Sequence, residues 1–211
     1  MRRAGRLPLE ALAPYLLDVP DPVALLNWSS IFANDNPVEV EVGFGKGLFL
    51  LTSSLANPQT NYLGIEIERK YQLFTANRIA KRNLGNVRLV KADARAFLRD
   101  CVPTESVQAV HVYFPDPWWK KRHHKRRLFT QEFAGQCARV LMPNGWLHVA
   151  TDVEEYFRIM TELVEQQSLL QPISLPATAL PAGDAEFQTN FERKSVLQGR
   201  SVNRAIYRKP V

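Results

Sequence analysis

The sequence predicts an α/β fold in which a mostly parallel sheet is flanked by helices on both faces. The first observation is that five predicted strands, the first of them the β-branched run 38–42, alternate with segments of helical periodicity. The second is that glycine and acidic residues recur where these strands are expected to end. The third is composition, because 45% hydrophobic and 23% charged residues in 211 positions are typical of one globular domain with at most small additions.

Each element of the alternation has its own signal. The five parallel strands are expected at 38–42, 62–67, 87–91, 107–114 and 146–150. Apolar spacing predicts helices that include 48–55, 73–80, 94–100, 129–141 and 153–164, with a stop signal at 142–145. A loop rich in Pro and Ala is expected at 171–185, and an antiparallel edge strand at 203–208.

Residues 1–36 are predicted to be an N-terminal helical extension, and residues 37–211 the main domain. Glu10 and Pro14 interrupt the apolar part of the extension, so we expect no signal peptide. No apolar run approaches the length of a membrane span. Cys101 and Cys137 belong to no Cys/His cluster, which predicts neither a zinc site nor a disulfide and favours the reducing cytoplasm.

The charge of the chain is concentrated in one place. The net charge is +6, and residues 120–127, KKRHHKRR, hold six Lys/Arg and no acidic residue, so the rest of the chain sums to zero. A basic block on a neutral body is typical of a surface that binds nucleic acid. The alternative on charge alone is a solvated run or a localisation signal.

Ligands of a parallel sheet bind beyond the carboxyl ends of its strands, and the first such end carries Glu41-Val-Gly43-Phe-Gly45-Lys-Gly47. Glycines allow positive φ and let a ligand approach the backbone. The spacing misses the dinucleotide pattern by one residue, because Leu48 stands where the third glycine belongs. A P-loop is also excluded, since Gly47 follows Lys46 in place of Ser or Thr. The remaining interpretations are a ligand without phosphates or a structural turn.

Two further strand ends carry carboxylates. Glu66 ends the second strand, where a carboxylate can accept hydrogen bonds from both hydroxyls of a ribose, in a nicotinamide enzyme as in others. Asp93 ends the third strand and could accept from an adenine amino group or cap the next helix. Together they indicate a nucleoside ligand without identifying it.

The most specific motif is Phe114-Pro-Asp116-Pro-Trp118-Trp119-Lys120, which follows the fourth strand. Prolines on both sides of Asp116 fix the backbone and hold the carboxylate at the rim of the sheet, where it could accept from the N1–H and N2–H₂ edge of guanine. Trp118 and Trp119 could stack a displaced base or belong to the core. The basic octet follows at once, which favours a nucleic-acid substrate.

Two later motifs have two interpretations each. Asp152 and Glu155 match a helix-capping pair, and the TNFE run at 189–192 matches a capping box, but either could also contact a ligand. His123 and His124 lie inside the basic run and are interpreted as RNA contacts rather than as bases.

With these motifs the chain resembles the bacterial tRNA guanine-N7 methyltransferase family. The resemblance covers 38–209 and rests on residues 41–47, 64–66, 91–94, 114–127, 151–152 and 189–192. Many methyltransferases share the nucleotide-side motifs, whereas FPDPWWKKRHHKRR and the late TNFE are particular to this family. The resemblance implies a class I, Rossmann-like fold with a seven-stranded sheet. It also implies transfer of the methyl group of S-adenosylmethionine to N7 of the variable-loop guanine at position 46 of tRNA.

The resemblance also implies roles for individual residues, with no metal. S-adenosylmethionine would be bound by Glu41, Gly43, Gly45, Glu66, Asp93 and Asp116, and Asp116 would also be the catalytic residue. The guanine nucleoside would be held by Lys120, Asp152, Thr189, Asn190, Phe191 and Glu192. The RNA would be contacted by Arg122, His123, His124, Lys125, Arg126 and Arg127. We expect a cytoplasmic enzyme that acts on tRNA as a monomer or homodimer and needs no second protein.

Two other functions stay open. A small-molecule oxidoreductase on a similar fold is disfavoured by the offset glycine and by the basic octet. A non-catalytic RNA-binding subunit is disfavoured by the carboxylates at the strand ends.

Guanine N7 carries an in-plane lone pair that needs no deprotonation, so methyl transfer requires no general base. We therefore expect positioning to dominate catalysis, with Asp116 as an orienting acceptor.

Overall fold

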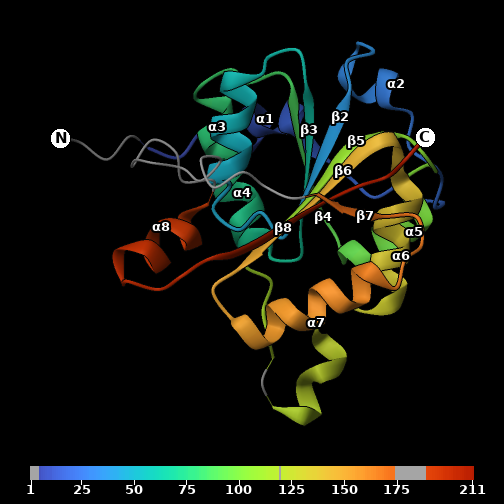
Figure 1. Cartoon of the computed structure of the whole chain (residues 1–211). Helices are drawn as coiled ribbons and strands as arrows, with labels where there is room; N and C mark the ends of the chain where they lie inside the picture. Colours follow the sequence, from blue (N-terminus) through green and yellow to red (C-terminus); the bar gives the residue numbers. More distant parts are fainter. Residues whose placement is uncertain (1–4, 119, 174–188) are drawn as a thin grey trace.

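The computed structural model describes residues 5–118, 120–173 and 189–211, which form a central sheet between two layers of helices (Figure 1). Within these residues the sheet has eight strands in the order β1-β4-β3-β2-β5-β6-β8-β7. The strands are β1 (Leu16–Leu17), β2 (Val38–Val42), β3 (Asn61–Glu66), β4 (Val87–Lys91), β5 (Val107–Tyr113), β6 (Leu141–Thr151), β7 (Gln171–Ile173) and β8 (Asn203–Arg208).

The helices cover both faces of this sheet. In Figure 1, α3 and α4 lie on one side, and α5, α6 and α7 on the other. The helices are α1 (Leu9–Leu12), α2 (Trp28–Phe32), α3 (Leu48–Ala56), α4 (Arg69–Ala80), α5 (Ala94–Cys101), α6 (Gln131–Val140), α7 (Glu154–Glu165) and α8 (Asn190–Leu197), with 3₁₀ turns η1 (Ala13–Tyr15) and η2 (Lys121–Arg126). Within the described chain, none of them is long and apolar enough to cross a membrane.

The sheet is largely buried because helices cover both of its faces. All six residues of β3 are buried, and Val40, Leu63 and Val110 on three adjacent strands have no exposed surface. One apolar cluster lies under α5, α6 and α7, and a second under α3 and α4. Because the chain runs outward from β2 to β3 and β4 and then returns to β5, the order reverses between β2 and β5, where ligands of such sheets bind.

The predicted alternation is confirmed. The five expected strands correspond to β2, β3, β4, β5 and β6, all parallel, and β8 pairs antiparallel with β6 from Trp146 to Thr151. The two further strands, β1 and β7, bring the described sheet to one strand more than the seven that the resemblance implied.

Two local predictions were wrong. Residues 171–173 were expected in a loop but form β7, because they pair antiparallel with β8; residues 174–185 of that loop lie outside the described residues. Residues 142–145 were expected to stop the preceding helix, and α6 does end at Val140, but the strand expected to start at 146 starts at Leu141 and includes them. A bulge between Val107 and Ala109 accommodates them, and Gly145 lies so close to the carbonyl oxygens of Met142 and Gln108 that a Cβ atom would be 2.8 Å and 3.0 Å away.

The N-terminal segment is less helical than its sequence suggested. In its described part, α1 and α2 have four and five residues, and Leu16–Leu17 form β1, which pairs with β4 at the sheet edge. The reason is the set of prolines, Pro8, Pro14, Pro20 and Pro22, which remove backbone donors and limit helix length. The division at residue 36 stays a prediction.

A polar network lies in the middle of the sheet, on the face under α3. His111 on β5 is 2.9 Å from Glu39 Oε2 through Nε2 and 2.9 Å from Tyr113 Oη through Nδ1, and its ring stacks on His148 of β6. Burial and the neighbouring His111 lower the pKa of His148 to about 3. His148 is therefore neutral at physiological pH.

Candidate active site

The glycine loop between β2 and α3 is shaped by backbone geometry that side chains disfavour. Gly43, Gly45 and Gly47 have φ values of 74°, 50° and 63°. At Gly47 the constraint is also steric, because a Cβ atom would lie 2.2 Å from Thr75 Cγ2 on α4. Thr75 in turn donates from its hydroxyl to the Gly45 carbonyl at 3.2 Å, so α4 holds the loop at the carboxyl end of the sheet.

Glu41 lies beneath this loop and is almost fully enclosed. Its side chain is buried, and within the described residues its Oε2 has no hydrogen-bond partner. Burial raises the pKa of Glu41 to about 8, partly opposed by a hydrogen bond from the Leu50 backbone and reinforced by the negative charge of Glu66. An unpaired buried carboxyl oxygen is a group that a polar ligand can satisfy.

Glu66 joins the end of β3 to the glycine loop. Its Oε2 accepts a hydrogen bond from the Gly45 backbone N–H at 2.9 Å, and its Oε1 accepts from the Glu68 N–H at 3.0 Å. The residue is 8% exposed. The structure thus brings Glu41, Glu66 and the glycines together around β2 and β3, as the strand-end argument predicted.

Asp93 ends β4 and is the N-cap of α5. It accepts from the Arg95 backbone N–H at 3.0 Å and forms an ion pair of 2.7 Å with the Arg95 side chain, and both contacts hold the pKa of Asp93 below its usual value. The capping interpretation is therefore confirmed. About 40% of its side chain remains exposed, and it lines a cavity of about 260 Å³ with Ala92 and Phe97, so its geometry also allows a ligand contact.

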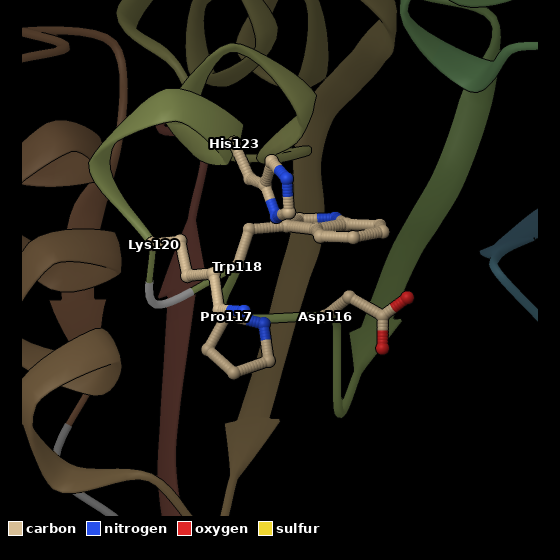
Figure 2. A pocket seen from close by; sticks show the side chains of 5 residues that line it. All are labelled: Asp116, Pro117, Trp118, Lys120 and His123. Atoms are coloured by element: carbon tan, nitrogen blue, oxygen red, sulfur yellow. The ribbon is translucent and has the colours of Figure 1, made fainter.

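Asp116 lies in the loop after β5, where it is exposed on the rim of a cavity of about 340 Å³. The other residues that line this cavity are Pro117, Trp118, Lys120 and His123 (Figure 2). Phe114 and Trp118 both have positive φ, 51° and 42°, which turns the loop sharply on either side of Asp116. In Figure 2 the Asp116 carboxylate points outward from this loop, and the His123 ring lies over the indole of Trp118.

The basic octet continues from this loop into η2, and several of its side chains pack on the loop itself. Arg127 Nε donates to the Pro117 carbonyl at 2.7 Å, and its guanidinium lies 5.4 Å from the Tyr156 ring centroid. The Arg126 guanidinium lies 5.1 Å from the centroid of the Trp118 ring. The His123 ring meets the Trp118 ring edge-on, with 5.7 Å between the ring centroids. Arg122 is exposed. The structure does not describe the side chains of His124 and Lys125.

Asp152, at the end of β6, does not cap α7, so the capping prediction for Asp152 and Glu155 was wrong. The N-cap residue is Val153, which makes no side-chain cap bond. Asp152 Oδ2 instead accepts from the Ser195 hydroxyl at 2.8 Å and forms an ion pair of 2.5 Å with Arg200. Asp152 makes these contacts instead of capping α7 because α8 and the turn before β8 lie against the end of β6.

The four residues of the TNFE run lie partly before α8 and partly within it. Thr189 is buried directly before α8, and Asn190, Phe191 and Glu192 form the first turn of that helix, with side chains outside the description. Sequence reasoning missed Ser195 and Arg200. The signal that could have found them is their position, three residues and eight residues after Glu192 and between the TNFE run and the edge strand expected at 203–208.

Residues 35–205 match the family described as a putative methyltransferase. A protein of Rhodopirellula baltica with the name tRNA (guanine-N(7)-)-methyltransferase is 41% identical, over 99% of this chain and 80% of its own. A protein of Alkalilimnicola ehrlichii with the same name is 37% identical, over 99% of this chain and 91% of its own.

Solved structures with a similar backbone are more distant in sequence. The 16S rRNA methyltransferase KamB superposes with a TM-score of 0.62 at 14% identity, over 89% of this chain and 95% of its own. The aminoglycoside resistance methyltransferase NpmB1 gives a TM-score of 0.56 at 19% identity, over 84% and 89% of the two chains. At these identities the likeness shows a shared fold.

Proposed function

The chain belongs to the tRNA (guanine-N7)-methyltransferase family, and we propose that its substrate is the guanine at position 46 in the variable loop of tRNA. The chain is a class I methyltransferase that uses S-adenosylmethionine to methylate guanine N7. The observation that supports a guanine in RNA as the substrate is the cavity at Asp116, which has an exposed carboxylate, an indole and a lysine beside a basic segment, whereas position 46 follows from the resemblance to the family.

The residues around the glycine loop fit S-adenosylmethionine. The unpaired oxygen of Glu41 and the carboxylates of Glu66 and Asp93 are acceptors for its amino and hydroxyl groups, and no phosphate cradle is needed. Glu66 and Asp93 would hold the ribose and the adenine, while Glu41, Gly43 and Gly45 would bind the amino-acid end of the cofactor. When bound, the cofactor supplies an electrophilic methyl group on a sulfonium centre.

The task of the protein is then to hold guanine N7 in line with that methyl group. Asp116 can accept from N1–H and N2–H₂ of the base, which orients the ring without removing a proton from N7. Lys120, Asp152 and the first turn of α8 would hold the rest of the nucleoside. Since the N7 lone pair is free, positioning supplies most of the rate enhancement, roughly 7–11 kcal/mol for well-oriented reactants.

The side chains of the basic octet divide into two kinds. Arg122 is exposed and would contact RNA phosphates, together with His124 and Lys125. Arg126 and Arg127 contact Trp118, Pro117 and Tyr156, so they would hold the Asp116 loop while they meet RNA.

Three further proposals follow from the family. Residues 37–211 would form the catalytic unit, which agrees with the family match at 35–205. The chain would act without a second protein, and its location would be the cytoplasm, where tRNA is modified. An assay with the purified chain alone tests the need for a partner.

The experiment for the proposed function is incubation with tRNA and methyl-labelled S-adenosylmethionine, followed by nucleoside analysis. We expect labelled 7-methylguanosine from wild-type tRNA. A tRNA in which adenine replaces guanine at position 46 should yield none. Equal labelling of the two tRNAs would reject position 46, and labelling of a different nucleoside would reject the reaction.

A further inference from the structure

The helix α4 presents a stripe of cations to solvent. Its core face is formed by Gln72, Thr75, Ala76, Ile79 and Ala80, which are buried. The opposite side of the helix and of the turn that follows it carries Lys70, Phe74, Arg78, Lys81 and Arg82, and we call these five residues the α4 stripe. Their spacing places them along one side of a helix about 18 Å long.

After the octet, the region around α4 is a second place in the chain where positive charge is concentrated. Residues 68–88 hold six Lys/Arg and one acidic residue, Glu68. This segment contributes +5 and the octet +6, so the rest of the chain carries −5 in a total of +6. Glu68 lies 3.6 Å from Lys70, but both side chains are more than half exposed, and such a pair neutralises little of the local potential.

The α4 stripe adjoins the cofactor loop at one place and the basic N-terminal segment at another. Arg78 donates to the Lys46 carbonyl in the glycine loop. Toward the end of α4, Asn77 Oδ1 accepts from the Leu7 N–H at 2.9 Å and Lys81 Nζ donates to the Gly5 carbonyl at 2.8 Å. These two bonds bring Arg6, which lies between Gly5 and Leu7, to the same surface.

Phe74 is the part of the stripe that folding does not explain. Its side chain is 48% exposed, and the Arg78 guanidinium lies 5.8 Å from its ring centroid. An exposed ring among cations suits contact with a nucleic acid, because bases stack on aromatic rings while lysine and arginine bind phosphates.

We propose that the α4 stripe is a second tRNA-binding surface, separate from the octet, that binds the phosphate backbone. The inference rests on the proposed tRNA substrate and adds where the rest of that molecule lies. Phosphate contacts fix the placement of an RNA without reading its bases. The stripe therefore contributes affinity for the body of the tRNA, while the Asp116 cavity selects the base.

The test is the salt dependence of tRNA binding by the double variant Lys70→Gln/Arg82→Gln. These two residues lie outside the cofactor and guanine sites. The matched control, Arg99→Gln/Arg158→Gln, removes the same charge from α5 and α7 on the other side of the sheet (Figure 1). We expect the slope of log affinity against log salt to fall by roughly 1.4–1.8 in the α4 variant, with S-adenosylmethionine affinity unchanged, and to stay at the wild-type value in the control.

The result that would overturn this inference differs from the result that would reject the proposed function. A wild-type slope in the α4 variant, or an equal loss in the control, overturns the inference even if labelled 7-methylguanosine still forms at the wild-type maximal rate. Absence of 7-methylguanosine with the wild-type chain rejects the proposed function instead. Phe74→Ser gives an independent reading, because it should weaken tRNA binding without changing the slope, and unchanged binding would remove Phe74 from the surface.

Discussion

The two halves of the candidate site are built differently. At the ends of β2 and β3, Glu41 and Glu66 are 3% and 8% exposed, and Glu66 already accepts from two backbone N–H groups. Past the end of β5, Asp116 and Lys120 are exposed on the wall of a cavity and stand on a loop with positive φ at Phe114 and Trp118.

The difference suggests that the two ligands are recognised by different means. The buried half is preorganised by the sheet and can bind a small cofactor with little movement. The exposed half has to meet a large RNA, whose phosphates reach only surface side chains. Changes in the buried half should therefore alter cofactor affinity and stability, and changes in the exposed half should alter turnover and tRNA binding.

The largest expected effect is that of Asp116→Asn. The amide would present a donor toward the donors of the guanine edge, so the base would be misplaced relative to the methyl group. We expect turnover in a single-turnover assay to fall about 100-fold or more. The unfolding temperature should not change, because the side chain is exposed. A wild-type rate would show that Asp116 does not orient the base.

The second effect concerns Glu41 in the buried half and is measured as the pH dependence of the free energy of unfolding. The pKa of Glu41 is raised from 4.5 to about 8 by burial, so the folded state holds a proton that the unfolded state releases above pH 4.5. The stability from this proton is complete below pH 4.5 and is lost as the pH rises through 8.

Glu41→Gln removes this titration while keeping the size of the side chain. Relative to wild type, the free energy of unfolding of Glu41→Gln should rise by roughly 2 kcal/mol between pH 6 and pH 8. Urea unfolding of both proteins across this range measures it. Parallel curves for the two proteins would mean that Glu41 is ionised in the fold.

Much of this contrast follows from the sequence. The five parallel strands, β2 and β4 among them, could be predicted because runs of strand-forming residues alternate with helical periodicity, which is the pattern of a parallel sheet covered by helices. The class I fold was predicted correctly from the same alternation and the resemblance. The glycine loop and Glu66 could be placed together because the ends of adjacent parallel strands share one edge.

What the sequence did not predict depends on contacts between distant segments. Asp152 has the spacing of a helix cap, yet Ser195 and Arg200, more than 40 residues away, bind its carboxylate. Residues 142–145 stop the preceding helix as expected, yet β6 starts before them at Leu141, which pairs with Val107, and backbone hydrogen bonds join Asn144 and Gly145 to Lys209, far along the chain. Arg126 and Arg127 look like free cations in the octet, but their contacts with Trp118 and Pro117 depend on how the loop folds back.

The third prediction returns to the buried half. Glu66→Gln keeps an acceptor but removes the charge that would hold the ribose hydroxyls, and hydrogen bonds to a charged group are worth about 1.5–3 kcal/mol. We expect the affinity for S-adenosylmethionine to fall roughly tenfold by calorimetry. The salt slope of tRNA binding should match wild type. An unchanged cofactor affinity would remove Glu66 from the cofactor site.

The smallest effect separates two arginines of the exposed half. Arg122 is exposed, whereas Arg127 donates to the Pro117 carbonyl and lies against Tyr156. Arg122→Gln should flatten the salt slope of tRNA binding by about 0.7–0.9, the value for one phosphate, and leave turnover at saturating tRNA unchanged. Arg127→Gln should flatten the salt slope in the same way and should also reduce turnover at saturating tRNA, because the loop that carries Asp116 loses its hydrogen bond. Arg127→Lys restores the charge but not the planar group that reaches Pro117 and Tyr156, so it should recover the salt slope and not the turnover. If the lysine variant recovers both, Arg127 acts only as a charge, and the octet is a uniform phosphate-binding surface instead of one that also supports the Asp116 loop.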